Sequence, residues 1–519
     1  MKIERTKNAS KNMVFGFLNR IQQTVLPFLM RTIMIVYMGE QYLGLNSLFT
    51  SILHILNLAE LGVGHAMIYS MYKPIADDDE STICALMGLY RKYYRIIGLV
   101  IATVGLALTP AIPYLIKGSI PSELNIYVLY LLNLGVTVLT YWLFAYKNSL
   151  MQAHQRMDVI SKITMITNVS QCVLQVVVLV VFRNYYLYMV IALLTQIATN
   201  IGTAIVANRM YPKYKPRGKL SVEKTKSINK KIRDLFTSKM GGAIIGPGDT
   251  VVISAFLGLS VLAIYQNYYF IMTAVIGIVE MILQSIMAGV GNSLVTETNK
   301  KNYDDFKKFT FLYLWMIGIG CCCFLSMYQP FIELWVGAER KLEDGMVICF
   351  ASYFLIYTAY RLMNLYKDAA GLWHHDRWRP LITGICNVGL NLIWVQWWGV
   401  YGVILSTIVS ILVVGMPWLL HNLFHSIFEK EKMWEYIGLV ACFAALTVVS
   451  GGVTWWLCGF VTGNLWLVII VRAAISVVVS NIVFLIALHR AKQFGPAVQM
   501  VDALTKNKLK LGKLFLRRG

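Results

Sequence analysis

Eight charged side chains lie inside long apolar stretches of the sequence, where a charge is costly and therefore informative. They are Arg20, Arg31, Glu60, Asp249, Glu280, Arg361, Asp368 and Arg472. A charge at the centre of a bilayer costs roughly 2.5–3.5 kcal/mol on insertion scales, so such residues usually face protein or a water-filled cavity. A guanidinium group binds phosphate through a two-pronged donor geometry. The arginines therefore indicate an anionic ligand.

Two of these stretches carry a polar stripe on one helical face. Arg20 and Arg31 are eleven residues apart, which on an α-helix is three turns plus roughly 20°, so both side chains point the same way. Pro27 lies between them and favours a kink. The second stripe consists of Tyr357, Arg361, Asn364 and Asp368.

From these stripes we predict a cationic substrate-binding cavity. Its predicted residues are Arg20, Arg31, Arg361, Asn364, Tyr357 and Tyr268. Tyr268 is included, with its neighbours Tyr265 and Tyr269, because aromatic faces stack on sugars. Two alternatives stay open: Arg20 can extend to water from near a span boundary, and Tyr268 can belong to the packing or to an aromatic belt at the membrane interface.

The acidic residues Glu60, Asp249 and Glu280 are the ion-coupling candidates. Each could bind a proton or a sodium ion, or could instead pair with one of the arginines as part of the structure. Asp368 is interpreted as a boundary charge, and Arg472 as a structural one.

No catalytic constellation accompanies these charges. The sequence has no phosphate-binding glycine loop with its lysine and no nucleophile–base pairing, and the nine cysteines lack metal-ligand spacing. We therefore predict no catalytic residue, no metal site and no cofactor other than a coupling cation (H⁺ or Na⁺) or the membrane potential. The chain is predicted to be a transporter, not an enzyme.

The elements that must position these residues are membrane helices. Of 519 residues 57% are hydrophobic and 14% are charged, whereas soluble domains carry about 25% charged residues. Fourteen apolar stretches are each long enough to cross a bilayer. We predict spans at 12–37, 43–72, 84–116, 124–150, 159–182, 185–208, 236–258, 261–294, 308–330, 346–368, 380–398, 400–426, 435–459 and 464–489.

The net charge of +21 is placed as expected for a membrane protein and does not indicate nucleic-acid binding. Lys117, Arg183, Arg340 and Lys341 are the basic residues of the loops predicted to be external, and most others fall in the loops and ends predicted to be cytoplasmic. Both termini are therefore predicted to be cytoplasmic. The first span lacks a cleavage site and should remain as an anchor.

An internal repeat relates the two halves of the chain. Met38-Gly39 matches Leu257-Gly258 at an offset of 219 residues, and Tyr146-Lys147 matches Tyr366-Lys367 one residue later. With six spans per copy, both copies have the same orientation, which makes the repeat parallel. Gly246-Pro247-Gly248, near the start of the second copy, predicts a bend or an unwound stretch.

The predicted fold is an all-α integral membrane protein with about fourteen transmembrane helices. Two six-helix lobes are followed by two appended helices and a tail. The predicted parts are a first lobe at 1–208, a basic linker with an interfacial helix at 209–239, a second lobe at 240–428, appended helices at 429–490 and a basic amphipathic tail at 491–519. Linker and tail are expected to bind anionic membrane lipids.

Several short motifs resemble a known family. They are Tyr42-Leu43-Gly44-Leu45, Leu58-Ala59-Glu60-Leu61-Gly62-Val63-Gly64, Asp249-Thr250-Val251-Val252-Ile253-Ser254, Leu257-Gly258 and Tyr265-Gln266-Asn267-Tyr268. With two six-helix lobes plus two helices, they resemble the polysaccharide-transport branch, which includes Wzx-type flippases, of the multidrug/oligosaccharidyl-lipid/polysaccharide (MOP, MATE-like) exporter superfamily.

The resemblance implies a flippase of the bacterial cytoplasmic membrane. It would move an undecaprenyl-diphosphate-linked oligosaccharide from the inner to the outer leaflet by alternating access. Implied partners are this substrate, membrane lipids, and the polysaccharide polymerase and glycosyltransferases of the same pathway, with no nucleic acid.

Other functions stay open beside the flippase. A cation-coupled multidrug exporter of the same superfamily would usually have twelve spans and cationic substrates, which the arginines would repel. A lipid II flippase shares fourteen spans and cavity arginines. A scaffold for glycan-assembly enzymes would leave the intramembrane charges without a purpose.

Overall fold

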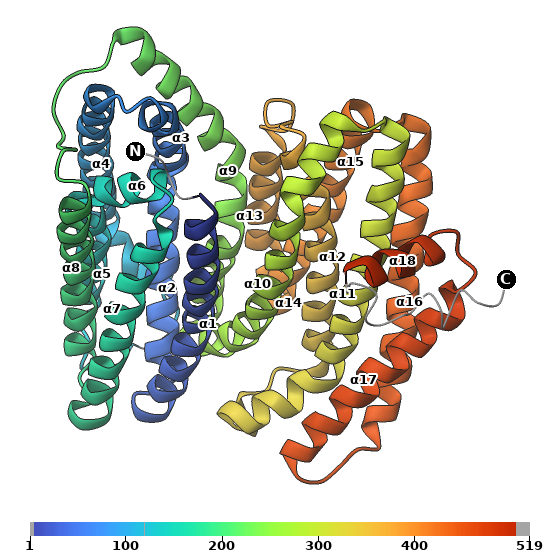
Figure 1. The fold of residues 1–519 in the computed structure, drawn as a ribbon. Coiled ribbons are helices and arrows are strands. Elements are labelled where there is room, and N and C mark those ends of the chain that lie inside the picture. Colours follow the sequence, from blue (N-terminus) through green and yellow to red (C-terminus); the bar gives the residue numbers. More distant parts are fainter. Residues whose placement is uncertain (1–4, 119, 505–519) are drawn as a thin grey trace. The chain divides into compact units, whose positions relative to one another are not determined.

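The computed structural model describes residues 5–118 and 120–504, and every regular element in this part of the chain is a helix (Figure 1). Ten of the described helices are long and apolar enough to cross a membrane. A bent pair of helices, α5 and α6, would be an eleventh span, with an angle of 49° between its parts. Each of the fourteen predicted spans coincides with a helical segment. The predicted fold class, an all-helical multi-pass membrane protein, is confirmed.

The chain divides into two compact units, Met1–Ala263 and Ile264–Gly519. The elements of the first unit are α1 (Arg5–Tyr37), α2 (Glu40–Leu56), η1 (Asn57–Glu60), α3 (Val63–Ala76), α4 (Glu80–Leu108), η2 (Thr109–Leu115), α5 (Ile126–Trp142), α6 (Ala145–Ala153), α7 (Met157–Val177), η3 (Val178–Phe182), α8 (Tyr185–Met210) and α9 (Val222–Leu257). This unit thus includes the predicted linker and the first span predicted for the second lobe.

The second unit begins within α10. Its elements are α10 (Leu259–Thr296), α11 (Asn299–Val336), η4 (Ala338–Arg340), α12 (Asp344–Ala369), α13 (Arg379–Trp398), α14 (Val400–Ser410), η5 (Ile411–Gly415), α15 (Met416–Ser426), η6 (Lys430–Lys432), α16 (Met433–Gly459), α17 (Leu465–Leu488) and α18 (Phe494–Leu504). The rest of the predicted amphipathic tail, from residue 505, lies outside the described residues.

Very short connections between spans are closed by local backbone chemistry. Arg183 takes a positive φ of 49°, and the Asn184 side chain then accepts a hydrogen bond from the Leu187 backbone N–H, which starts α8. Gly399 has a φ of 55° and joins α13 to α14. A residue in the left-handed region reverses the chain in one step, so a one- or two-residue connection is sufficient here.

The second predicted span is broken in the structure. It consists of α2, the short 3₁₀ segment η1 and α3, and Gly62 follows the break with a φ of 89°. A Cβ atom on Gly62 would lie 2.8 Å from the Leu235 Cβ atom. The first half of α9 therefore packs directly against this break, and only a glycine fits at the contact.

Helix α9 differs from the prediction. The sequence predicts an interfacial helix within the linker 209–239 and a bend or an unwound stretch at Gly246-Pro247-Gly248. Instead α9 is one helix of 36 residues that continues through Pro247. Its first half packs on α3, and the Tyr93 hydroxyl donates a hydrogen bond of 2.6 Å to Asn229 Oδ1. These contacts hold the linker part of α9 against the first unit.

The appended pair, α16 and α17, packs on α11 through small polar side chains. The Cys322 thiol donates to Ser450 Oγ at 3.4 Å, and the hydroxyl oxygens of Ser326 and Ser476 are 2.6 Å apart. Small residues let helix backbones approach closely in a membrane, where there is no hydrophobic force between helices. Since the partners lie on three helices, this seam joins the appended pair to the second unit.

Candidate functional site

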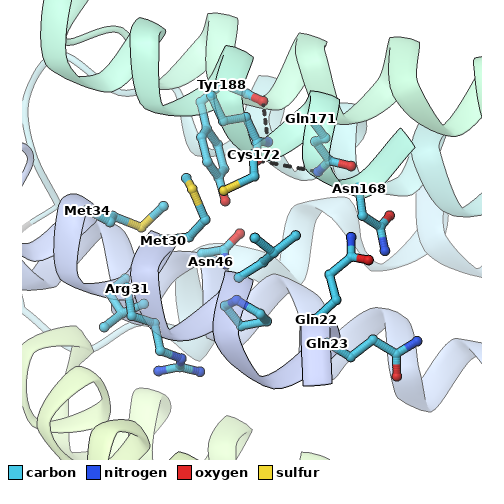
Figure 2. A pocket seen from close by; sticks show the side chains of 14 residues that line it. Gln22, Gln23, Met30, Arg31, Met34, Asn46, Asn168, Gln171, Cys172 and Tyr188 are labelled. Carbon is cyan, nitrogen blue, oxygen red and sulfur yellow. Dashed lines mark hydrogen bonds between the residues drawn. The ribbon is translucent and has the colours of Figure 1, made fainter. Parts of the chain in front are cut away.

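A cavity of about 310 Å³ lies inside the first unit, between α1, α2, α7 and α8 (Figure 2). Six carboxamide side chains line it: Gln22, Gln23, Asn46, Asn168, Gln171 and Gln175. In Figure 2 the two amides of α1 face those of α7, and the methionines of α1 lie farther along the same helix. The cavity therefore combines neutral polar side chains with apolar ones, and ligand pockets begin at about this size.

Some of these carboxamides are held by the protein and others keep free hydrogen-bonding capacity. Gln175 donates to the Tyr188 carbonyl oxygen at 3.0 Å, and the Thr195 hydroxyl donates to Gln171 Oε1 at 3.0 Å. The Asn46 and Asn168 side chains make no hydrogen bond to the described part of the chain. Gln22 donates to the Met165 carbonyl, but its own Oε1 atom is buried without a partner.

This arrangement suits a ligand rich in hydroxyl groups. A carboxamide offers both a donor and an acceptor, and a sugar hydroxyl can satisfy both at once. A buried amide without a partner costs about 1–3 kcal/mol, which a bound hydroxyl would recover. The neutral amides place no charge in the cavity, so they can contact a sugar whatever the charge of the rest of the ligand.

Arg31 contributes the only cationic group to this cavity's lining among the described residues. Figure 2 shows its side chain leaving α1 on the side away from Asn168 and Gln171. Arg31 thus lies at the edge of the cavity, and the amides of Asn168 and Gln171 lie on its opposite side. Arg20, about three turns earlier in α1, is exposed and does not line the cavity.

In the second unit the structure pairs two of the predicted residues. Arg361 Nε of α12 lies 2.8 Å from Glu280 Oε1 of α10. The side chains are 40% and 27% exposed, and Arg361 Nε makes no hydrogen bond of good geometry despite the short distance. The pair is therefore a Coulombic contact that is partly open to the surroundings. An anionic ligand can replace Glu280 beside the guanidinium without breaking a hydrogen bond at Nε.

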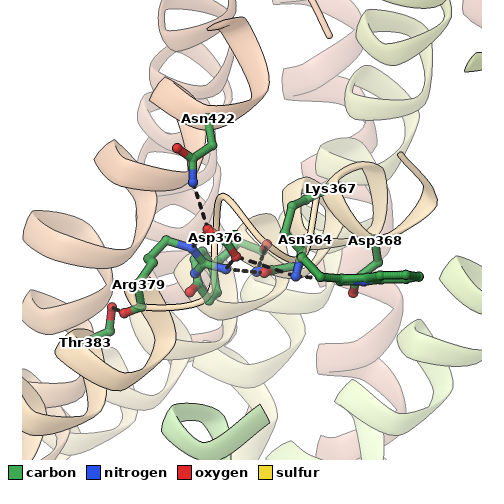
Figure 3. Close-up of polar contacts among 9 residues, drawn as sticks. Asn364, Lys367, Asp368, Asp376, Arg379, Thr383 and Asn422 are labelled. Carbon is green, nitrogen blue, oxygen red and sulfur yellow. Dashed lines mark hydrogen bonds and ion pairs between the residues drawn. The ribbon is translucent and has the colours of Figure 1, made fainter. Parts of the chain in front are cut away.

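Asn364, one turn after Arg361, belongs to a buried polar network (Figure 3). Its Oδ1 atom accepts a hydrogen bond of 2.8 Å from Arg379, whose Nε donates to Asp376 Oδ1 at 2.6 Å. Asn422 also donates to this carboxylate, and Lys367 lies 3.5 Å from its other oxygen. Arg379 and Asp376 are each only 1% exposed. The network fixes the side chain of Asn364, which follows Tyr357 and Arg361 along the same polar stripe of α12.

The ion-coupling candidate Glu60 lies at the break of the second span. Its Oε1 atom accepts a hydrogen bond of 2.9 Å from the Tyr94 hydroxyl. The Tyr94 and Tyr90 hydroxyl oxygens are 2.7 Å apart, and Ser149 donates to Tyr90 at 2.8 Å. A hydrogen-bonded chain thus connects Glu60 to α4 and α6. Its role in coupling stays a prediction.

Two other predicted residues are deeply buried. Asp249 is 1% exposed in α9 of the first unit. Tyr268 is fully buried in the second unit, where its hydroxyl donates to Gln329 Oε1 at 2.8 Å and accepts from the Leu342 N–H at 3.0 Å. These bonds link α10 to α11 and to the segment before α12, and a substrate contact of Tyr268 stays a prediction.

The carboxamides are functional candidates that the sequence reasoning did not select. Asn168, Gln171 and Gln175 are spaced by three and four residues, which places them on one face of a membrane helix. A search for polar, uncharged residues at helical spacing within apolar spans would have found them. Among the described residues no group of three or more His, Cys, Asp or Glu side chains could hold a metal ion.

Comparison with known proteins now identifies the family. The sequence model of a family described as "Polysaccharide biosynthesis protein" matches residues 9–287, more than half of the chain. The chain belongs to the polysaccharide biosynthesis protein family. The sequence matches none of the curated proteins.

Solved structures show the fold of this polysaccharide biosynthesis protein. A lipid II flippase MurJ in an inward closed conformation matches with a TM-score of 0.65 and 15% identity, over 92% of this chain and 98% of that one. An inward-facing MATE family multidrug transporter of the MOP superfamily matches with a TM-score of 0.56 and 16% identity, over 78% and 94%. The Vibrio cholerae MATE transporter VcmN matches with a TM-score of 0.52 and 13% identity, over 80% and 96%.

The family match and the shared fold confirm the resemblance seen in the sequence motifs. The protein is a multi-pass membrane protein of the polysaccharide biosynthesis protein family, and it has the fold of the MurJ and MATE structures.

Proposed function

We propose that this protein is a flippase for an undecaprenyl-diphosphate-linked oligosaccharide. It moves the repeat unit from the inner to the outer leaflet of the bacterial cytoplasmic membrane, for surface polysaccharide biosynthesis, by alternating access. Both termini are cytoplasmic in this proposal. The observation that carries it is the carboxamide-lined cavity inside a membrane-spanning unit, because a sugar is the ligand class that uses such side chains best.

Each part of the substrate has a matching group in the proposal. The sugars contact the amides of α1, α2 and α7. Arg31, at the wall of the same cavity, is assigned to the diphosphate, since phosphate forms charge-assisted hydrogen bonds with a guanidinium group. Within the second unit, considered by itself, Arg361 beside Glu280 is a further guanidinium group that can bind a phosphate. The polyprenyl chain stays in the lipid. Alternating access then requires that the ligand bind both conformations, and differential contacts decide the direction of travel.

Coupling is assigned to Glu60 in the proposal. The residue lies at a broken membrane helix, and irregular backbone at membrane depth is tolerated where it is buried in protein or lines a cavity. The Tyr94 hydroxyl bonds the carboxylate, so a proton or a cation arriving there would change the contact that α4 makes with the break.

A deletion strain tests the proposal. Surface polysaccharide and lipid-linked oligosaccharide on the cytoplasmic side are measured after complementation with the wild type, with Arg31→Ala or with Arg361→Ala. Loss of surface glycan with accumulation of the lipid-linked precursor, reversed by the wild type and not by the arginine variants, is the expected result. Unchanged glycan together with altered sensitivity to cationic drugs would assign the protein to the exporters instead.

Lipid II is the second candidate substrate, because a lipid II flippase shares the fold over 92% of this chain. Expression of the protein in cells depleted of their own lipid II flippase separates the two. Growth of the depleted cells would favour lipid II, and lysis in spite of normal expression would favour the polysaccharide precursor.

A further inference from the structure

A second cavity, of about 900 Å³, lies at one end of the second unit, between α11, α12, α16 and α17. The loop between α16 and α17 and the segment between α11 and α12 close this end, which is the lower end of the unit in Figure 1. None of the residues discussed for the sugar cavity lines it. It therefore needs an occupant of its own.

Arg472 forms one wall of this cavity with a charge that no carboxylate neutralises. Its two Nη atoms donate to the carbonyl oxygens of Ser326 at 3.3 Å and Val461 at 3.2 Å, and its Nε atom is buried without a partner. Within the described part of the chain no carboxylate lies within 4.0 Å of it. Neutral carbonyls orient the guanidinium group but leave its charge, which is costly two turns inside a membrane helix.

The position of Arg472 is set by the seam that joins α17 to α11. Ser476, one turn further along α17, is 2.6 Å from Ser326 and also donates to the Arg472 carbonyl oxygen. Because the two helices are in close contact there, the guanidinium group cannot swing to the far side of α17. The guanidinium group is therefore held at the wall of the cavity.

The start of α12 supplies the opposite charge. Glu343 and Asp344 line the cavity, and each accepts a hydrogen bond from a neutral side chain: the Tyr401 hydroxyl donates to Glu343 at 3.0 Å, and Gln329 donates to Asp344 at 2.9 Å. The other charged residues of the lining, Lys341 and Glu333, neutralise each other at 2.7 Å. One cation of α17 and two carboxylates at the start of α12 thus line the same cavity.

The mouth of the cavity is apolar and aromatic. Trp455 and Trp456 of α16 are 59% and 61% exposed, and Phe460 and Ile348 extend the apolar rim. Tryptophan side chains are enriched at the level of lipid headgroups, where an apolar ring and a polar N–H are both satisfied. An occupant that enters here has hydrocarbon chains outside and a polar group inside.

We propose that this cavity binds a zwitterionic phospholipid of the ethanolamine type. The phosphate binds Arg472, the ammonium group donates to Glu343 and Asp344, and the acyl chains lie along the tryptophans. An ammonium with three N–H donors satisfies both carboxylates, whereas a trimethylated choline group has no donor. An anionic glycerol headgroup would meet the carboxylates without a positive charge to offset them.

Native mass spectrometry of the purified, delipidated full chain tests this site. Phosphatidylethanolamine, phosphatidylcholine and phosphatidylglycerol are added separately at equal concentration. The wild type is expected to retain one phosphatidylethanolamine in preference to the other two lipids. Arg472→Gln should lower this occupancy about tenfold, the effect of one lost charge-assisted contact. Arg490→Gln, near the other end of α17 and outside the cavity, is the matched control and should bind as the wild type does.

The carboxylates give an independent test that does not depend on Arg472. The double variant Glu343→Gln/Asp344→Asn should lose the preference for ethanolamine over choline and gain binding of phosphatidylglycerol. Equal lipid binding by the wild type, Arg472→Gln and the double variant would overturn the proposal, as would a wild type that prefers phosphatidylglycerol. If Arg472→Gln does not fold, Arg472→Lys, which keeps the charge, must retain the lipid while the double variant changes the preference.

Discussion

Gly39 and Gly258 adopt the same backbone conformation, with φ and ψ of 102° and 167° in the first and 96° and 173° in the second. Each directly precedes a membrane helix, α2 and α10. They are the two glycines that match at an offset of 219 residues in the sequence. The same backbone turn thus occurs at corresponding points of the two copies, and it lies in a region that glycine adopts far more easily than other residues.

The two glycines should respond differently to alanine. Both variants acquire strain of about 1 kcal/mol from the positive φ. A Cβ atom at Gly258 would also lie 2.8 Å from the Lys117 carbonyl oxygen, whereas at Gly39 nothing lies within 4 Å. Thermal unfolding in detergent should therefore rank the wild type above Gly39→Ala, and Gly39→Ala above Gly258→Ala.

Gly438→Ala is the control for this pair, since it lies inside α16 with open space around it. It should be neutral or slightly stabilising, because alanine favours a helix more than glycine does. Equal unfolding temperatures for Gly39→Ala and Gly258→Ala would contradict the contact at Lys117.

The carboxamide cavity predicts which amides matter for transport. Asn168→Leu keeps the approximate size of the side chain but removes its hydrogen bonds. Loss of one neutral hydrogen bond, about 0.5–1.5 kcal/mol, should lower transport about twofold to tenfold. Transport is measured in proteoliposomes with a labelled lipid-linked oligosaccharide.

Gln196→Leu provides the comparison for the amide variant. Gln196 is a carboxamide of α8 in the same unit, but it bonds Asn200 and does not line the cavity. It should transport at close to the wild-type rate. If both variants lose activity equally, the effect belongs to the helix bundle and not to the cavity.

The pair between Arg361 and Glu280 predicts opposite effects of two neutral substitutions. Arg361→Gln removes the phosphate partner and should weaken substrate binding about tenfold or more. Glu280→Gln releases the guanidinium group from its competing carboxylate and should tighten binding. Binding is measured with a short-chain diphosphate analogue of the substrate, at low and at high salt.

Salt supplies the internal check of this prediction, because a charge-based contact that is partly exposed weakens as ionic strength rises. An Arg361→Gln variant with unchanged affinity, or a Glu280→Gln variant that binds more weakly than the wild type, would show that the pair is purely structural.

His154 predicts a pH dependence of stability. It is 5% exposed, its ring lies 4.2 Å from that of Tyr211, and burial lowers its pKa below the ordinary 6.5. The unfolded chain binds this proton more readily than the folded one, so stability is complete above about pH 6.5 and falls as the pH drops toward the lowered pKa. His154→Phe keeps an aromatic ring at this position but has no proton to bind. The variant should therefore lose less stability than the wild type between pH 8 and pH 5, as measured by its unfolding temperature.

The match at offset 220 provides the control, since His374 is the counterpart of His154 and is exposed. His374→Phe should keep the wild-type pH dependence of the unfolding temperature. A pH dependence that survives in His154→Phe would mean that other groups cause it.

The sequence was sufficient to predict the helical segments because a bilayer imposes one requirement on every span. A run of apolar residues between polar ends, such as the one that begins after Gly399, can only be a helix there. It did not predict the continuity of α9. The effect of Pro247 on the backbone can be inferred from neighbouring residues, but the packing of α9 on α3 involves residues that are far apart in the sequence. The sequence also did not predict that Arg361 contacts Glu280, which depends on how α10 and α12 pack.

The carboxamide cavity was missed for an energetic reason. A charge inside a span indicates a site already in the sequence, because it is energetically costly there. An amide such as Asn168 costs less and can be satisfied by any neighbouring carbonyl, so its presence in the sequence does not indicate a site. Asn168 is recognised as part of a site only because residues of α1 line the same cavity, and this proximity is visible only in the three-dimensional structure.

The unbroken helix α9 has a consequence for synthesis of the protein. At 36 residues it is about 54 Å long, and its two halves pack on α3 and α2. The ribosome must therefore deliver residues up to Leu257 before the first unit can close, well after its eighth helix has emerged. Until then the break at Gly62 lacks the helix that covers it. An insertion factor or chaperone could shield the break during the time between the synthesis of α3 and the synthesis of α9.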